Sequence, residues 1–189
     1  MTTHVLLGGN GYLGREVTRQ WLAADPQARF IVVSSSGANQ LTDPRVTTIA
    51  ADATSYESLA AALPQQFDTI VNFLGRPGKN DEDNHTINVL PVRAMQQLAA
   101  ERGAKALGYI GGKLGPKKFT ATKADMIAEL RAGSLSLAVV EPTVIYGGGR
   151  SDALAKMVPL FKFLGIFSAT FKPVTVEEVA ADLVDQLTR

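Results

Sequence analysis

The chain has 189 residues, a formal net charge of +1 and no cysteine. Its apolar fraction of 46% is enough for a buried core. The near-neutral charge disfavours a nucleic-acid partner, because phosphate binding needs a concentrated basic face. The lack of cysteine excludes disulfides and thiolate metal sites, and two histidines make a metal site improbable. No targeting peptide or apolar run of ~20 residues is visible, which predicts a cytoplasmic protein without a membrane span.

Short β-branched, apolar runs alternate with helical patterns along the chain. Strands are expected at His4–Leu7, Phe30–Ser34, Val46–Ala50, Thr69–Phe73, Ala106–Ile110 and Leu137–Glu141. Helices are expected at Gly14–Ala24, Ser55–Leu63, Asn88–Arg102 and Thr120–Arg131. This alternation predicts an α/β fold, a Rossmann-like doubly wound parallel sheet. Since no linker is visible, residues 1–189 are expected to form a single domain.

Two segments break the alternation. Residues 75–84 are polar and rich in turn formers, which predicts a surface loop at the carboxyl end of a strand, beside any ligand crevice. Residues 157–171 are apolar and aromatic. They are expected to cover a pocket or to form a homodimer contact, and the alternative is a docking surface for a partner or a membrane face.

A glycine-rich turn lies between the first expected strand and the first expected helix. Its glycines at 8, 11 and 14 read G-x-x-G-x-x-G. Such a turn presents backbone N–H groups and a helix dipole to an anion, as in the binding of a dinucleotide pyrophosphate. The alternative is an ordinary glycine-rich loop. The expected cofactor contacts of this turn are Gly8, Asn10, Gly11, Tyr12, Leu13 and Gly14.

The end of the second expected strand bears on the choice of cofactor. An NAD site usually has a carboxylate there, which accepts both ribose hydroxyls. This chain has Ser34, Ser35 and Ser36 instead, with no carboxylate before Asp43. Serine hydroxyls can donate to a 2′-phosphate, and Arg15 could balance its charge, unless that arginine is only a surface residue. The pattern favours NADP(H) over NAD(H).

Several segments, in the same order, resemble the extended and atypical short-chain dehydrogenase/reductases, an epimerase-like NAD(P)H-binding group. Besides the glycine turn they are Ala51–Ala53, Val71–Gly75, Asn88–Ala94, Glu141–Arg150 and Lys172–Ala180. The resemblance implies that Asp52 and Ala53 lie near the adenine. It also implies that the segment Phe73, Leu74, Gly75 passes the cofactor. Residues 147–189 would then be a reduced substrate or cap region with a small pocket.

The expected catalytic machinery departs from this family. Its Tyr-x-x-x-Lys pair is here Phe119 and Lys123, and Gly111-Gly112 replaces the partner serine or threonine. Lys123 remains a candidate for ribose binding and catalysis, with a solvated helical lysine as the alternative. The sequence therefore predicts an oxidoreductase that transfers hydride directly to a small-molecule substrate without the usual phenol. The alternatives are a non-catalytic NAD(P)H sensor or structural subunit, and a partner-docking module.

Overall fold

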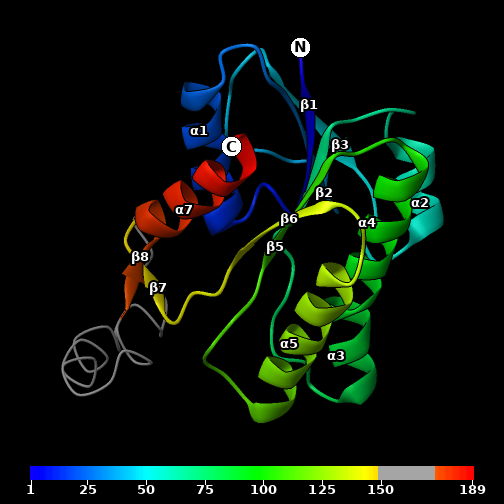
Figure 1. Ribbon diagram of the computed structural model, residues 1–189, viewed down its shortest axis with the longest axis vertical. Helices are drawn as coiled ribbons and strands as arrows, with labels where there is room; N and C mark the ends of the chain where they lie inside the picture. Colours follow the sequence, from blue (N-terminus) through cyan, green and yellow to red (C-terminus); the bar gives the residue numbers. More distant parts are fainter. Residues whose placement is uncertain (149–172) are drawn as a thin grey trace.

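The computed structural model describes residues 1–148 and 173–189, and its centre is a six-stranded parallel sheet (Figure 1). The strands are β1 (Thr3–Leu7), β2 (Arg29–Ser34), β3 (Val46–Ala50), β4 (Thr69–Asn72), β5 (Ala106–Ile110) and β6 (Ser136–Val140). They lie in the order β3-β2-β1-β4-β5-β6. The chain thus winds outward from β1 in one direction and then returns to β4 on its other side. The expected doubly wound α/β fold is confirmed, and its switch point lies between β1 and β4.

Helices cover both faces of the sheet. They are α1 (Tyr12–Ala24), α2 (Tyr56–Ala62), α3 (Asp81–Asn88), α4 (Leu90–Glu101), α5 (Lys117–Arg131) and α7 (Val176–Thr188). Helices α1 and α7 pack together on one face, whereas α2, α4 and α5 lie on the other (Figure 1). Both faces are therefore buried, which explains why the strands read as nearly continuous apolar runs.

Each face of the sheet has its own hydrophobic cluster. In β1 the side chains alternate, so that Val5 and Leu7 join the cluster under α2, α4 and α5, whereas Leu6 joins the cluster under α1 and α7. In β4, Ile70 and Val71 divide between the clusters in the same way. This period of two fixes the strand register. The carboxyl ends meet at one edge because all six strands run parallel.

The segment between β4 and α4 differs from the expectation of a surface loop over residues 75–84. Helix α3 begins at Asp81, so the expectation is wrong for its last four residues. Asn80 caps this helix, since its side-chain oxygen accepts the N–H of Asp83 at 2.8 Å. Acidic side chains at 81, 82 and 83 favour the same helix end through its dipole. The long helix expected at Asn88–Arg102 corresponds to α4 (Leu90–Glu101), and it begins two residues later because Asn88 is the last residue of α3.

The carboxyl-terminal part forms a second, small sheet. Strand β7 (Ile145–Tyr146) pairs in parallel with β8 (Val174–Thr175), and α7 follows through a capping box of Thr175 and Glu178. Helix α7 packs against α1 and β6. The apolar segment 157–171 lies outside the described residues, so its covering or dimer role stays a prediction. None of the described helices is long and apolar enough to cross a membrane.

Candidate functional site

The glycine turn joins β1 to α1 at the switch point of the sheet. The N–H of Gly8 donates to the carbonyl of Val33 at 2.9 Å, and that of Gly11 donates to the carbonyl of Gly8 at 2.9 Å. A Cβ on Gly8 would lie 2.7 Å from Leu74 Cδ2, and one on Gly14 would lie 2.7 Å from the Cα of Gly9. Neither position has room for a side chain, so the backbone passes close to its neighbours throughout the turn.

The first turn of α1 has an open amino-terminal end. Gly11 is the N-cap residue, and no side chain caps the helix. Among residues 1–148 and 173–189, no acceptor takes the N–H groups of Leu13 and Gly14. Unpaired first-turn amides with the helix dipole behind them favour an anion. The turn therefore has the donors that a phosphate group needs.

A groove of about 890 Å³ runs over the carboxyl ends of β1 to β4 and opens onto this turn. Its volume is in the range of small-molecule sites. Nine expected site residues line it: Gly8, Asn10, Gly11, Ser34, Asp52, Ala53, Phe73, Leu74 and Gly75. The other lining residues are Val33, Ser35, Ser36, Ala51, Thr54, Arg76, Ile87 and Pro91. The fold thus brings the expected glycine, serine, aspartate and β4 segments into one continuous space.

Two of the expected cofactor residues line a neighbouring hollow instead. The hydroxyl of Tyr12 donates to the carbonyl of Gly147 at 2.8 Å. The guanidinium of Arg15 donates to the carbonyl of Asn10 at 2.9 Å. Both side chains border the hollow beside Gln40, whose N–H donates to the side chain of Asn10. Leu13 and Gly14 are buried behind the turn. The side chain of Leu13 does not line the groove and Gly14 has none, so any ligand contact of these two residues is through the backbone.

Serines and one carboxylate line the end of the groove over β2 and β3. The side chain of Asp52 accepts the hydroxyl of Thr54 at 2.7 Å and its N–H at 2.9 Å. These hydrogen bonds lower the pKa of Asp52 and keep it ionised. Ser34 turns its hydroxyl to the carbonyl of Ala38. This end of the groove offers an acceptor and several hydroxyls, which suits the hydroxyl groups of a ribose.

Lys123 lies beneath the groove at the ends of β4 and β5. Its side chain is only 3% exposed, and its Nζ donates to the carbonyls of Ile110 at 2.9 Å and Leu74 at 3.1 Å. The ammonium also lies 4.6 Å from the centre of the Tyr109 ring. Burial lowers the pKa of Lys123 to about 8. The alternative of a solvated helical lysine is therefore wrong.

The position one turn before Lys123 lacks an ionisable group. Phe119 places its ring centre 5.9 Å from the Nζ, and Gly112 lies against that ring. Tyr109 has a phenol, but it is fully buried, and burial raises its pKa. The hydroxyl of Thr122 is bonded to Asn84 and to the carbonyl of Lys118. None of the described residues that line the groove has a phenol.

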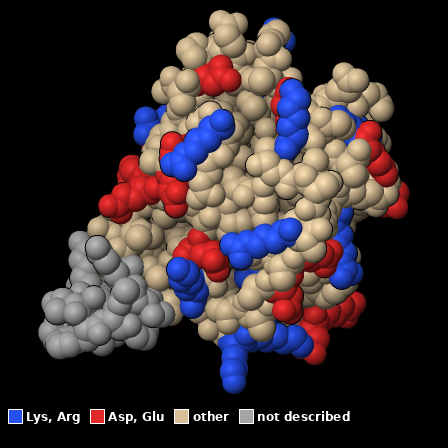
Figure 2. Space-filling model, viewed as in Figure 1, with Lys and Arg blue, Asp and Glu red and all other residues tan. Residues whose placement is uncertain are grey.

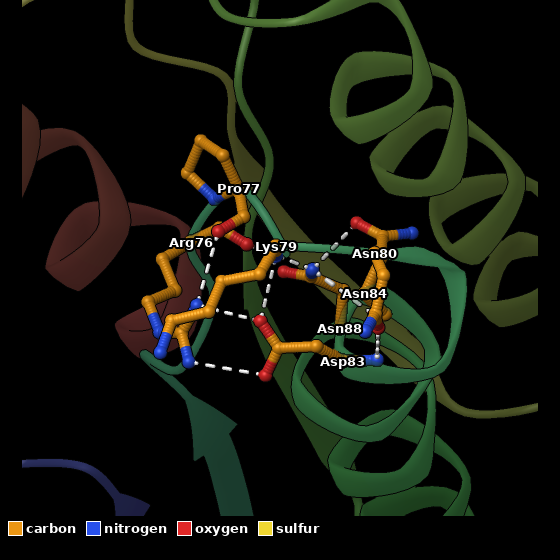
Figure 3. A network of polar contacts seen from close by, with 7 residues as sticks. All are labelled: Arg76, Pro77, Lys79, Asn80, Asp83, Asn84 and Asn88. Carbon is orange, nitrogen blue, oxygen red and sulfur yellow. Dashed lines mark hydrogen bonds and ion pairs between the residues drawn. The ribbon is translucent and has the colours of Figure 1, made fainter.

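Sequence reasoning missed Arg76, which lines the groove directly after Gly75. Figure 3 shows its side chain facing Asp83, with ion-pair distances of 2.9 and 3.1 Å. Its backbone carbonyl accepts the side-chain amide of Asn88 at 2.9 Å. Arg76 lies in a stretch of turn-forming residues, and its place directly after Gly75, which was expected to pass the cofactor, was the one sequence signal that pointed to it.

Charges of both signs are interspersed over the face of the molecule shown in Figure 2. That face offers no concentrated basic surface of the kind that nucleic acids bind. Within the part of the chain that the structure describes, no group of three or more histidine, aspartate or glutamate side chains could hold a metal ion. The groove is thus the feature of the described residues best suited to a ligand.

Solved structures share the fold of this chain at low sequence identity. *Bordetella bronchiseptica* WbmH in complex with NAD⁺ matches with a TM-score of 0.70 and 13% identity, over 98% of this chain and 72% of that one. A variant of ElxO with NADPH bound matches with a TM-score of 0.69 and 17% identity, over 96% and 89%. A short-chain dehydrogenase/reductase from *Serratia marcescens* matches with a TM-score of 0.68 and 17% identity, over 97% and 89%.

The family assignment rests on the sequence itself. No curated protein matches the chain. The model of a family described as NAD(P)H-binding, however, matches residues 8–153, which is well over half of the sequence. The matched stretch begins at the glycine turn and contains every residue that lines the groove. This agrees with the resemblance to the short-chain dehydrogenase/reductases, and the chain therefore belongs to the NAD(P)H-binding family.

Proposed function

We propose that the groove binds a nicotinamide dinucleotide with its pyrophosphate at the amino-terminal end of α1. The observation that carries this proposal is the pair of unpaired amides at Leu13 and Gly14, in the first turn of α1 directly after the groove-lining Gly11. Asp52 and the serines then face the adenosine half over β2 and β3. The nicotinamide half extends toward β4 and β5, as is usual at the switch point of a doubly wound sheet.

We further propose that NADP(H) is preferred to NAD(H). The end of β2 provides three serines and no carboxylate, so a 2′-phosphate meets donors rather than a repelling charge. Asp52 follows the next strand, β3, and a carboxylate in the groove disfavours a 2′-phosphate. Arg15 donates one N–H from Nη1 to the carbonyl of Asn10, and its other N–H donors could contribute to binding a 2′-phosphate. Dissociation constants for NADPH and NADH, measured side by side, test the preference directly.

The proposed reaction is a direct hydride transfer between the nicotinamide and a small-molecule substrate. The bound dinucleotide supplies the hydride chemistry, and the protein binds, orients and shields it. Lys123 secures the ends of β4 and β5, where the nicotinamide half would lie, through its two carbonyl contacts. Phe119 provides an apolar surface in place of a proton donor, so protonation of the product falls to water or to the substrate.

A non-catalytic NAD(P)H-binding sensor is the second candidate function. It is favoured by the same observations, since the phenol is absent and Lys123 is committed to two carbonyls. NADPH consumption against a panel of quinones and aldehydes separates the two functions. Oxidation above the rate without acceptor supports the reductase, whereas tight binding with no turnover of any acceptor supports the sensor.

Substitution of Gly11 tests the binding proposal itself. Gly11 is exposed and has a φ of −68°, which any residue adopts. As an uncapped N-cap position it suits aspartate, so Gly11→Asp leaves α1 intact but places a carboxylate where the pyrophosphate would lie. Wild-type protein should gain roughly 2.7 kcal/mol of stability at NADPH concentrations a hundredfold above Kd, measured by thermal unfolding. Gly11→Asp should lose this gain.

Gly11→Ala is the matched control for charge, because it adds only a methyl group at the same position. It should retain most of the NADPH-dependent stabilisation, with a smaller loss from crowding of the carbonyl of Gly8, which would lie 3.1 Å from the new Cβ. A full NADPH response in the aspartate variant would disprove the assignment of the pyrophosphate to this turn.

A further inference from the structure

We propose that Arg76 binds the phosphate of the dinucleotide that is farther from adenosine, with the edge of its guanidinium that Asp83 leaves free. The inference rests on the proposed function, since it assigns one more contact to the same groove. It identifies a diphosphate as the ligand group and Arg76 as a specificity residue on the β4 side of the site.

Only some of the N–H donors of the Arg76 guanidinium are hydrogen-bonded. Nη1 and Nη2 together hold the carboxylate of Asp83, and Nη1 also donates to the carbonyl of Pro77 at 3.1 Å (Figure 3). An arginine has five N–H donors in a planar fork. Within residues 1–148 and 173–189, the Nε–H and the second N–H of Nη2 have no acceptor. These two donors form one edge of the fork, which matches a pair of phosphate oxygens.

The surroundings of Arg76 hold it in place at the groove. Asp83 accepts the N–H of Lys79 at 2.7 Å and donates its own N–H to the cap residue Asn80 at 2.8 Å. Asn88, buried in α3, donates its side-chain amide to the carbonyl of Arg76. The ion pair thus lies between a fixed backbone and a fixed helix end. A side chain ordered in this way loses less entropy when it binds a ligand.

The position of the charge in the groove identifies the phosphate. Among the described residues that line the groove, Arg76 is the only lysine or arginine and Asp52 is the only carboxylate. Asp52 follows β3 and Arg76 follows β4, with β2 and β1 between these strands. Gly8 at the end of β1 lies against Leu74, two residues before Arg76. A diphosphate on the glycine turn, with its adenosine toward Asp52, therefore has its far phosphate on the side of Arg76.

The test compares two probes that differ in that phosphate. ADP-ribose has both phosphates, whereas AMP has only the one next to adenosine. Arg76→Gln should raise the Kd for ADP-ribose about tenfold, the effect of one charge-assisted hydrogen-bonded contact, and leave the Kd for AMP within about twofold. Arg93→Gln is the matched control. Arg93 is 57% exposed and paired with Glu129, comparable to Arg76 at 51%, but does not line the groove.

The possible results separate this inference from the proposed function. Equal weakening of both probes would indicate a long-range charge effect, and unchanged ADP-ribose binding would indicate no contact. Either result overturns the inference while dinucleotide binding stands. Arg76→Lys retains the charge without the fork, so full wild-type affinity in that variant also overturns it. If wild-type protein binds neither ADP-ribose nor NADPH, the proposed function fails and the inference fails with it.

Discussion

Gly75, which lines the groove, lies directly against the buried side chain of Lys123. Gly75 has a φ of +143°, and a Cβ there would lie 2.4 Å from the Nζ of Lys123. Because that Nζ is buried and donates to two carbonyls, it cannot move aside without losing charge-assisted hydrogen bonds. Gly75→Ala should therefore reduce the free energy of unfolding by about 3 kcal/mol, measured by urea titration, from backbone strain plus the displaced ammonium.

Gly103→Ala separates these two causes. Gly103 also has a positive φ, of +71°, but no atom lies within 4 Å of its Cβ position. Its substitution should cost about 1 kcal/mol, from backbone strain alone. Equal losses in the two variants would show that the close approach to Lys123 contributes nothing, and that Gly75 is needed only for its backbone conformation.

Helix α3 shows how a short element can determine a site. It provides Asp83, which holds Arg76, and Asn88, which donates its side-chain amide to the carbonyl of Arg76 and to the side chain of Asn84. The helix depends on the cap at Asn80, so Asn80→Ala should reduce the free energy of unfolding by about 1 kcal/mol. Asn80→Ser should restore most of this loss in the same urea titration. If the alanine variant is as stable as wild type, the cap does not hold the helix.

The same helix, α3, could not be predicted from the sequence. Residues 81–88 contain one aliphatic side chain and four charged or histidine residues, so no apolar stripe distinguishes them from a loop. The cap and the acidic first turn were present, but they are weak signals without periodicity. In α1 and β1, by contrast, a strong apolar pattern was interrupted by glycines, and the expected turn was found there. The missed Arg76 follows from the missed helix.

At the scale of the whole molecule, strand–helix alternation was enough to predict the parallel sheet, because each crossover has to cover a face that the strands leave apolar. The neighbourhood of β1 and β4 is seen only in the strand order of the structure. The alternation also could not predict which side chains of α3 and α4 reach the groove, since Ile87 and Pro91 are placed by helix packing and not by the sheet. Their local sequence has no ligand-binding signature.

The hydrophobic cluster under α1 contains a histidine, His4, that makes the free energy of unfolding depend on pH. The ring of His4 stacks on Trp21 at 4.1 Å and on Phe30 at 5.3 Å, and neither of its nitrogens has a partner among the described residues. Burial lowers its pKa from 6.5 to about 4. Above pH 6.5 the imidazole is neutral in both states, so stability is complete. As pH falls toward 4, the unfolded chain binds a proton that the folded protein does not.

Wild-type protein should therefore lose about 3 kcal/mol of its free energy of unfolding between pH 7 and pH 4 through this one group. His4→Phe keeps the aromatic packing without an ionisable ring, so its urea midpoint should fall less over the same range. His85→Gln, an exposed position in α3, should follow the wild-type slope. Carboxylates such as Asp68, whose pKa is lowered by the N–H of Thr3, add a loss shared by all three proteins. Identical slopes for wild type and His4→Phe would mean that the buried ring takes up its proton without unfolding the protein.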